Sequence, residues 1–116
     1  MPIPLPAFTG SPFMATGVSA PFVVYGQFLV SIWGTPLNGD GTPGSFVGTV
    51  RLERSGDQGT TYLPVSIDGA GTPATYSGSV VVEGEDVNGA YYRFNCVGYT
   101  SGTINYSAVG TIAVAP

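Results

Sequence analysis

No window of the chain after residue 21 repeats apolar residues at helical spacing without an intervening glycine or proline. Both residues interrupt helices, and with 18 and 10 copies they reach about twice their usual share of a chain of 116 residues. Short runs rich in valine, isoleucine, tyrosine and phenylalanine lie between these breakers, as expected of β-strands. The sequence therefore predicts one all-β domain with close to no helix.

Two of the runs indicate how the strands are covered. Residues 22–33 are apolar at nearly every position, which is typical of a central strand covered on both faces. Residues 46–54 alternate, with Val50 and Leu52 on one side and polar residues on the other. The expected strands are 22–33, 46–54, 60–67, 79–83, 90–99 and 103–114. This number and spacing of strands predict an antiparallel β-sandwich, either immunoglobulin-like or jelly-roll-like.

Two pairs of neighbouring runs are predicted to form hairpins. The turn at 55–59 joins the second run to the third, and the turn at 100–102 joins the last two. Short glycine-containing loops between alternating runs are the strongest local β signal, so the second hairpin is the clearer one. A further turn is expected at 85–89, ahead of the run that begins at residue 90.

Residues 1–21 differ from the rest and are predicted to form an extended proline-rich N-terminal arm, with the β-sandwich domain at 22–116. Five prolines exclude a helix or a central strand there, because proline fixes φ and lacks an N–H. The arm also carries Phe8, Phe13 and Met14, which a solvated tail has little reason to contain. We expect these three side chains to make contacts between subunits. The alternative is that the arm folds back over its own sandwich.

Charge and residue usage exclude several functions. Three arginines, no lysine and a formal net charge of −4 leave no basic surface for binding nucleic acid. Histidine, the commonest general base and metal ligand, is absent, and Cys96 is the single cysteine. We therefore expect no enzyme, no catalytic residue, no metal site and no cofactor.

The N-terminal sequence and the apolar runs bear on location. The first six residues lack the cationic start and unbroken apolar core of a signal peptide. No apolar run approaches the roughly 20 residues of a membrane helix. We expect synthesis in the cytoplasm and no membrane partner.

The seven carboxylates suggest two roles. The segment Glu83–Asp86, with Asn88 nearby, offers several oxygens to a hard cation such as Ca²⁺, but no ligand loop of defined spacing is present, so a solvated turn is favoured. Glu53 lacks the second facing acid that glycoside hydrolysis requires. We expect Glu53 to pair across the sheet with Arg93 or to lie beside Arg51.

Residues 55–62, with the sequence SGDQGTTY, resemble the Asp-box turn of sialidases and related propellers. In such a turn Asp57 accepts hydrogen bonds from backbone N–H groups, and Gly59 adopts a positive φ. A propeller needs several such repeats, and the chain has one copy. A structural turn is therefore predicted.

Residues 85–96, from the acidic turn through the tyrosines to the cysteine, resemble the F strand of immunoglobulin-like domains. Because Cys96 has no partner, no disulfide between sheets forms, and its thiol is expected to be a small buried hydrophobic group. Trp33 is then expected to pack in the core.

Over residues 22–106, the succession VVYGQFLVSIWG, FVGTVRLERS and YYRFNC resembles small β-sandwich proteins encoded among the head and tail genes of tailed bacteriophages. Members of that group resemble capsid decoration (cement) proteins. The resemblance implies a structural virion protein that forms homo-oligomers on the capsid surface. Its partners would be copies of itself and the major capsid protein, whose lattice it stabilises.

A function of another class stays open, namely a carbohydrate or host-surface binding module of a tail fibre or of another accessory protein of the phage. Seven tyrosines and Trp33 supply flat aromatic faces that stack on sugars. Tyrosines that alternate along strands more often pack in a core.

Overall fold

The structure is a computed structural model that describes residues 7–35, 45–66 and 72–114. It confirms the all-β prediction, because the described residues form eight strands of one antiparallel sheet and no helix. None of these ranges contains a helix long and apolar enough to cross a membrane. The strands are β1 (Ala7–Thr9), β2 (Gly17–Val18), β3 (Phe22–Thr35), β4 (Val47–Ser55), β5 (Leu63–Pro64), β6 (Thr75–Tyr76), β7 (Val80–Ser101) and β8 (Thr103–Val114).

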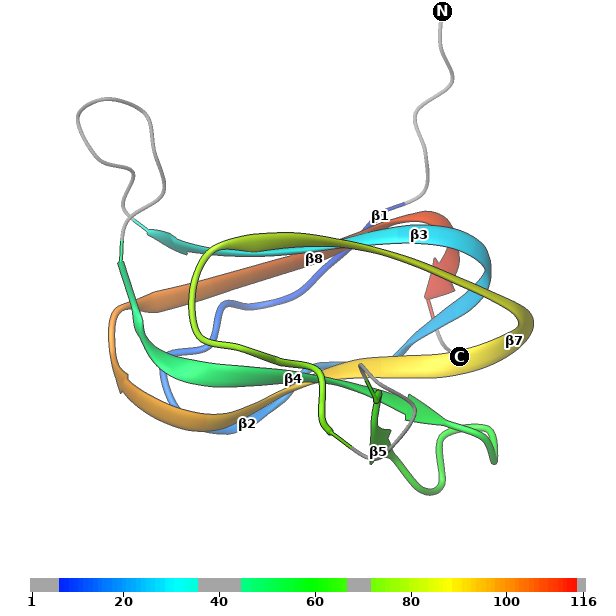
Figure 1. Ribbon diagram of the computed structural model, residues 1–116, viewed down its shortest axis with the longest axis horizontal. Coiled ribbons are helices and arrows are strands. Elements are labelled where there is room, and N and C mark those ends of the chain that lie inside the picture. The colour runs from blue at the N-terminus through cyan, green and yellow to red at the C-terminus, as the bar shows by residue number, and fades with distance from the viewer. Residues whose placement is uncertain (1–6, 36–44, 67–71, 115–116) are drawn as a thin grey trace, which may run out of the picture.

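The long strand β7 links the two halves of a curled sheet. The strand order is β1-β8-β3-β7-β4-β5, with β2 added to β7 and β6 to β4. Residues 80–92 of β7 pair with β3, whereas residues 91–101 pair with β4. The first half, formed by β1, β8, β3 and the start of β7, therefore faces the second half, formed by β2, the end of β7, β4, β5 and β6 (Figure 1).

The core lies between the two halves and is rich in aromatic rings. Phe22 and Phe94 are fully buried, and their ring centroids are 5.7 Å apart. The ring of Phe94 on β7 also packs against Tyr106 on β8, at 4.9 Å. Burying a phenylalanine side chain contributes about 1.5–3 kcal/mol, so this cluster stabilises the contact between the halves.

The predicted hairpin between residues 90–99 and 103–114 is wrong. The end of β7 pairs with β4 and β2, while β8 pairs with β1 and β3. Gly102, with a φ of 90°, lies at the corner where the chain passes from the second half to the first. Side chains that alternate along both runs therefore meet across the core, and the two runs do not pair with each other as neighbouring strands.

The predicted turn at 85–89 is a bend within β7 and does not separate two strands, because β7 is one strand from Val80 to Ser101 (Figure 1). Glu85 and Asp86 pair with Gln27 and Gly26 of β3. The register with β3 shifts between Asp86 and Ala90, and Gly89 adopts a positive φ of 73° where β7 bends from the first half of the sheet to the second.

The prediction that residues 22–33 form a central strand is confirmed, since β3 pairs with β7 on one side and β8 on the other. However, the described part of the chain buries only one of its faces. Leu29 on the other face is 40% exposed, and Trp33, which was expected in the core, is only half-buried. The buried face carries Phe22, Val24, Phe28, Val30 and Ile32.

The arm joins the two halves of the sheet. Its strand β1 pairs with β8, and its strand β2 pairs with β7 (Figure 1). Between them, the backbone of Phe13 exchanges two hydrogen bonds with Ile104, at 2.8 and 3.0 Å. The described part of the arm therefore connects two edges that the rest of the sheet leaves apart.

Candidate functional site

Two of the three arm residues predicted to contact other subunits are buried in the chain's own core. The ring of Phe8 stacks on Phe22, and the ring of Phe13 packs on Tyr106, both with centroids 4.9 Å apart. Met14 is 67% exposed. For these two rings the structure thus favours the alternative, in which the arm folds back over its own domain. Contacts of the arm with other chains stay a prediction.

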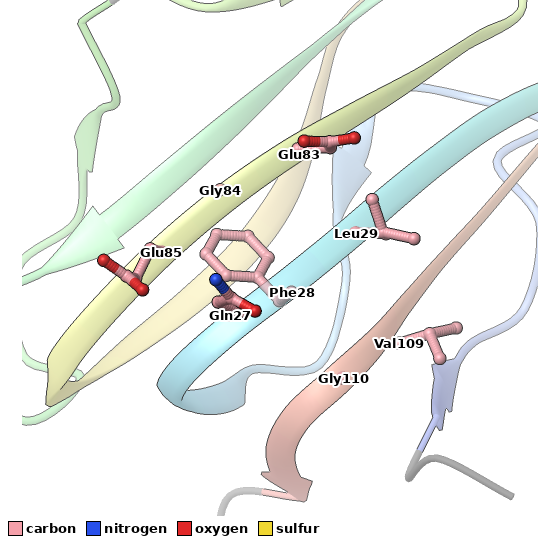
Figure 2. A pocket seen from close by; sticks show the side chains of 8 residues that line it. All are labelled: Gln27, Phe28, Leu29, Glu83, Gly84, Glu85, Val109 and Gly110. Atoms are coloured by element: carbon pink, nitrogen blue, oxygen red, sulfur yellow. The ribbon is translucent and has the colours of Figure 1, made fainter.

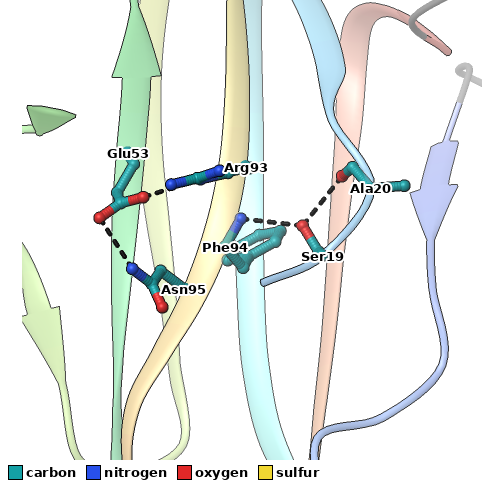
Figure 3. A network of polar contacts seen from close by, with 6 residues as sticks. All are labelled: Ser19, Ala20, Glu53, Arg93, Phe94 and Asn95. Carbon is teal, nitrogen blue, oxygen red and sulfur yellow. Dashed lines mark hydrogen bonds and ion pairs between the residues drawn. The ribbon is translucent and has the colours of Figure 1, made fainter. Parts of the chain in front are cut away.

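Ser19 fastens the end of the arm to β7. Its backbone N–H donates to the carbonyl of Phe94, at 2.9 Å. Its hydroxyl accepts the N–H of Phe94, at the same distance (Figure 3). The hydroxyl in turn donates to the carbonyl of Ala20. Ser19 is itself buried, so its hydroxyl's bond to Phe94 is shielded from water.

Glu53 forms the predicted pair with Arg93. Its carboxylate accepts hydrogen bonds from Arg93 Nε at 2.8 Å and from Asn95 Nδ2 at 3.0 Å (Figure 3). The ring of Tyr62 covers the Arg93 guanidinium, with Cζ 4.1 Å from the ring centroid. The side chain of Glu53 is only 7% exposed, so its carboxylate is engaged within the fold.

The acidic segment 83–86 is divided between solvent and core. Glu83 and Glu85 are exposed, as a solvated segment predicts, but Asp86 is buried. Its Oδ2 atom accepts hydrogen bonds from Arg54 Nε at 2.6 Å and from the hydroxyl of Tyr92 at 2.9 Å. Asp86 therefore faces the interior, away from its neighbours, and the described ranges contain no group of three or more potential metal ligands.

Tyr92 makes the fold sensitive to alkaline pH. Burial, together with the hydrogen bond to Asp86, raises the pKa of Tyr92 from 10.0 to about 12. The unfolded chain therefore loses this proton from pH 10 upward while the folded chain keeps it, so stability is complete below pH 10 and falls as the pH rises to about 12.

We expect the free energy of unfolding to fall by about 2–3 kcal/mol over that interval because of Tyr92. Urea unfolding of the native chain and of the Tyr92→Phe variant at a series of pH values measures this effect. The variant should show a shallower decrease, and equal slopes would contradict the assignment to Tyr92.

The Asp-box-like turn has the geometry that its sequence predicted. Asp57 Oδ1 accepts the hydroxyl of Ser55 and the N–H of Thr61, both at 2.7 Å. These bonds, that of Ser55 first, lower the pKa of Asp57 to about 2. Gln58 and Gly59 adopt positive φ values of 61° and 90°. The turn closes the predicted hairpin of β4 and β5, in which Glu53 pairs with Pro64.

Cys96 is a small buried group, as predicted. It is 1% exposed, and its thiol donates to the carbonyl of Gly98 at 3.3 Å. Burial raises the pKa of this thiol, which disfavours the reactive thiolate.

The outer face of the first half is the candidate site that motif reasoning missed. We use this name for the side of β1, β8, β3 and the start of β7 that points away from the core. Pairing aligns Leu29 with Glu83 and Val109, and Ser31 with Val81 and Ser107. These side chains are exposed or half-buried. The signal for this face was present, because residues 22–33 are apolar at positions that point to both sides of the strand.

Comparison with known proteins adds no family, since no family model, no curated protein and no solved structure matches the chain. The outer face and the arm are therefore the features from which a function is inferred.

Proposed function

We propose that this chain is a structural virion protein of a tailed bacteriophage, of the capsid decoration type, which oligomerises and stabilises the major capsid lattice. It acts through contacts between protein surfaces at the outside of the virion. The resemblance of residues 22–106 to phage accessory proteins supports this proposal. We also propose the finer form of the fold, a β-sandwich of immunoglobulin-like or jelly-roll-like type with a proline-rich arm.

The observation that carries the proposal is the uncovered outer side of β3. A strand that is apolar on both faces is typical of one buried on both, yet the residues that the structure describes cover only the inner face. A surface of another protein chain would bury the remaining apolar groups. Val81, for example, is 64% exposed beside Ser31, at the start of β7.

The chemistry of the outer face suits a protein partner. Leu29, Val81 and Val109 lie among Thr9, Ser31 and Ser107, and most of this surface carries no charge. The central part of protein interfaces is similarly depleted in charged residues.

Co-sedimentation with capsid shells tests the proposal. The shells are assembled from the major capsid protein encoded in the same genome, and we expect the chain to bind them saturably in a fixed stoichiometry. Val81→Lys should weaken binding by about tenfold or more, because it places a charge among the exposed apolar side chains of the outer face. Leu63→Lys is the matched control, since Leu63 is equally exposed but lies on β5 in the second half.

The absence of saturable binding to shells would overturn the decoration role. Equal binding by the Val81→Lys and Leu63→Lys variants would reject the outer face as the surface that contacts the shell. Binding of the native chain to a glycan array, without binding to shells, would instead support the carbohydrate module. That alternative is favoured by the partly exposed rings of Tyr25 and Trp33 on β3.

A further inference from the structure

We infer that one end of the outer face binds an extended segment of another protein that carries two basic side chains two residues apart. The inference rests on the proposed function, because it specifies the chemistry of the partner at the same face. Three observations carry it, namely a groove, a pair of unpaired carboxylates and the placement of the chain's own cations.

The groove runs across three strands of the first half. It has a volume of about 610 Å³ and lies where β3, β7 and β8 are neighbours (Figure 2). Pairing places Gln27 beside Glu85, and Leu29 beside Glu83. On the other side of β3, Val109 of β8 lies beside Leu29. The groove thus combines an apolar strip with a carboxylate rim on one surface.

The two carboxylates determine how far apart the two basic side chains of the ligand must lie. Glu83 and Glu85 are two residues apart on one strand, so both side chains point to the same side and are separated by about 7 Å along it. Both are exposed, and neither forms an ion pair with a described residue. A second extended chain that lies along β7 repeats this distance between its own residues i and i+2.

The chain itself does not offer two free cations at residues i and i+2 of an extended segment. This argues against a second copy of the chain as the occupant of the groove. Arg54 is paired with Asp86, and Arg93 is paired with Glu53. Arg51 lies on β4 in the second half and is half-buried. No two of these cations project freely at i and i+2, so a different, basic chain is the complementary partner.

The apolar strip favours lysine or arginine over a small cation. The aliphatic stems of these residues cover apolar surface while their charged ends reach an anion. Leu29, 40% exposed beside Glu83, offers such a surface. A basic peptide segment therefore gains binding free energy both from its charged ends at the carboxylates and from its aliphatic stems on the apolar strip.

Titration of the full-length ¹⁵N-labelled chain with synthetic peptides tests the inference. The probe is acetyl-Gly-Ser-Arg-Val-Arg-Ser-Gly-amide, and the comparison peptides replace both arginines by glutamine or place them next to each other. We expect the probe to shift the amide signals of residues 27–29, 83–85 and 109–110. It should bind about tenfold more tightly than the glutamine peptide at low salt, and the adjacent-arginine peptide should fall between them.

Two double variants separate site contacts from overall charge. Glu83→Gln with Glu85→Gln should reduce the affinity for the probe to that for the glutamine peptide. Ser77→Lys with Thr100→Lys makes the same change in net charge at exposed positions outside the groove and should retain most of the binding. Equal loss in both variants, equal binding of the probe and the glutamine peptide, or shifts at other residues would overturn the inference.

The two proposals can fail separately. Saturable binding to shells that is unaffected by Glu83→Gln and Glu85→Gln leaves the decoration role standing and rejects the basic segment. Localised binding of the probe without binding to shells supports the groove and rejects the decoration role.

Discussion

Replacing Phe13 by alanine lowers the free energy of unfolding by about 3–5 kcal/mol, the usual cost of removing a buried phenylalanine ring. Phe13 is 7% exposed, and its ring packs on Tyr106, which itself contacts Phe94 across the core. Removing the ring therefore leaves a cavity where the arm meets the two halves of the sheet. Chemical unfolding followed by circular dichroism measures the effect.

Met14→Ala is the matched control for this experiment. Met14 is the next residue along the arm but is exposed, so its replacement should change stability by less than about 0.5 kcal/mol. If Phe13→Ala were as stable as Met14→Ala in a monomer, the arm would not fill the chain's own core. If Phe13→Ala lowered the free energy of unfolding of an oligomer but not that of the monomer, the result would instead support the prediction that the arm contacts another subunit.

Replacing Asp86 by alanine lowers the free energy of unfolding by about 3 kcal/mol. The side chain of Asp86 is 6% exposed, and its removal deprives the buried hydroxyl of Tyr92 of its acceptor. It also leaves Arg54 without its ion pair, although the guanidinium side chain is 39% exposed and regains water. That partial hydration places the effect at the lower end of the range for breaking a buried pair.

Glu83→Ala provides the comparison, because Glu83 is a carboxylate on the same strand with an exposed side chain. We expect a change of less than about 0.5 kcal/mol there. Thermal and urea unfolding of both variants at neutral pH give the difference. Equal effects would show that the pair of Arg54 with Asp86 contributes nothing to stability.

The failed hairpin prediction shows where local patterns stop being informative. Alternating residues around Phe94 and Tyr106 indicate that each strand has one buried face. That pattern is identical whether the two strands lie side by side or face each other across a core. The rings of Phe94 and Tyr106, 4.9 Å apart, show the second arrangement, which depends on contacts with β3 and β4 elsewhere in the chain.

The candidate surface was partly predictable for a similar reason. The double-sided apolar pattern of residues 22–33 predicted that both faces would be covered, but not which face the chain itself would cover. Burial of Val30 with exposure of Leu29 answers that question. The groove beside Glu83 required the pairing of three strands, so no single segment of the sequence indicated it.

The sequence by itself determined the features that arise from neighbouring residues. These are the all-β class, the turn around Asp57 and Gly59, and the buried Cys96, which follow from the steric limits of glycine and proline and from alternating hydrophobicity. Only the tertiary structure decided that β7 joins both halves, that β8 pairs with β3, and that Phe8 and Phe13 fill the chain's own core. Those outcomes depend on contacts between residues far apart in the chain, whose free energies no local pattern records.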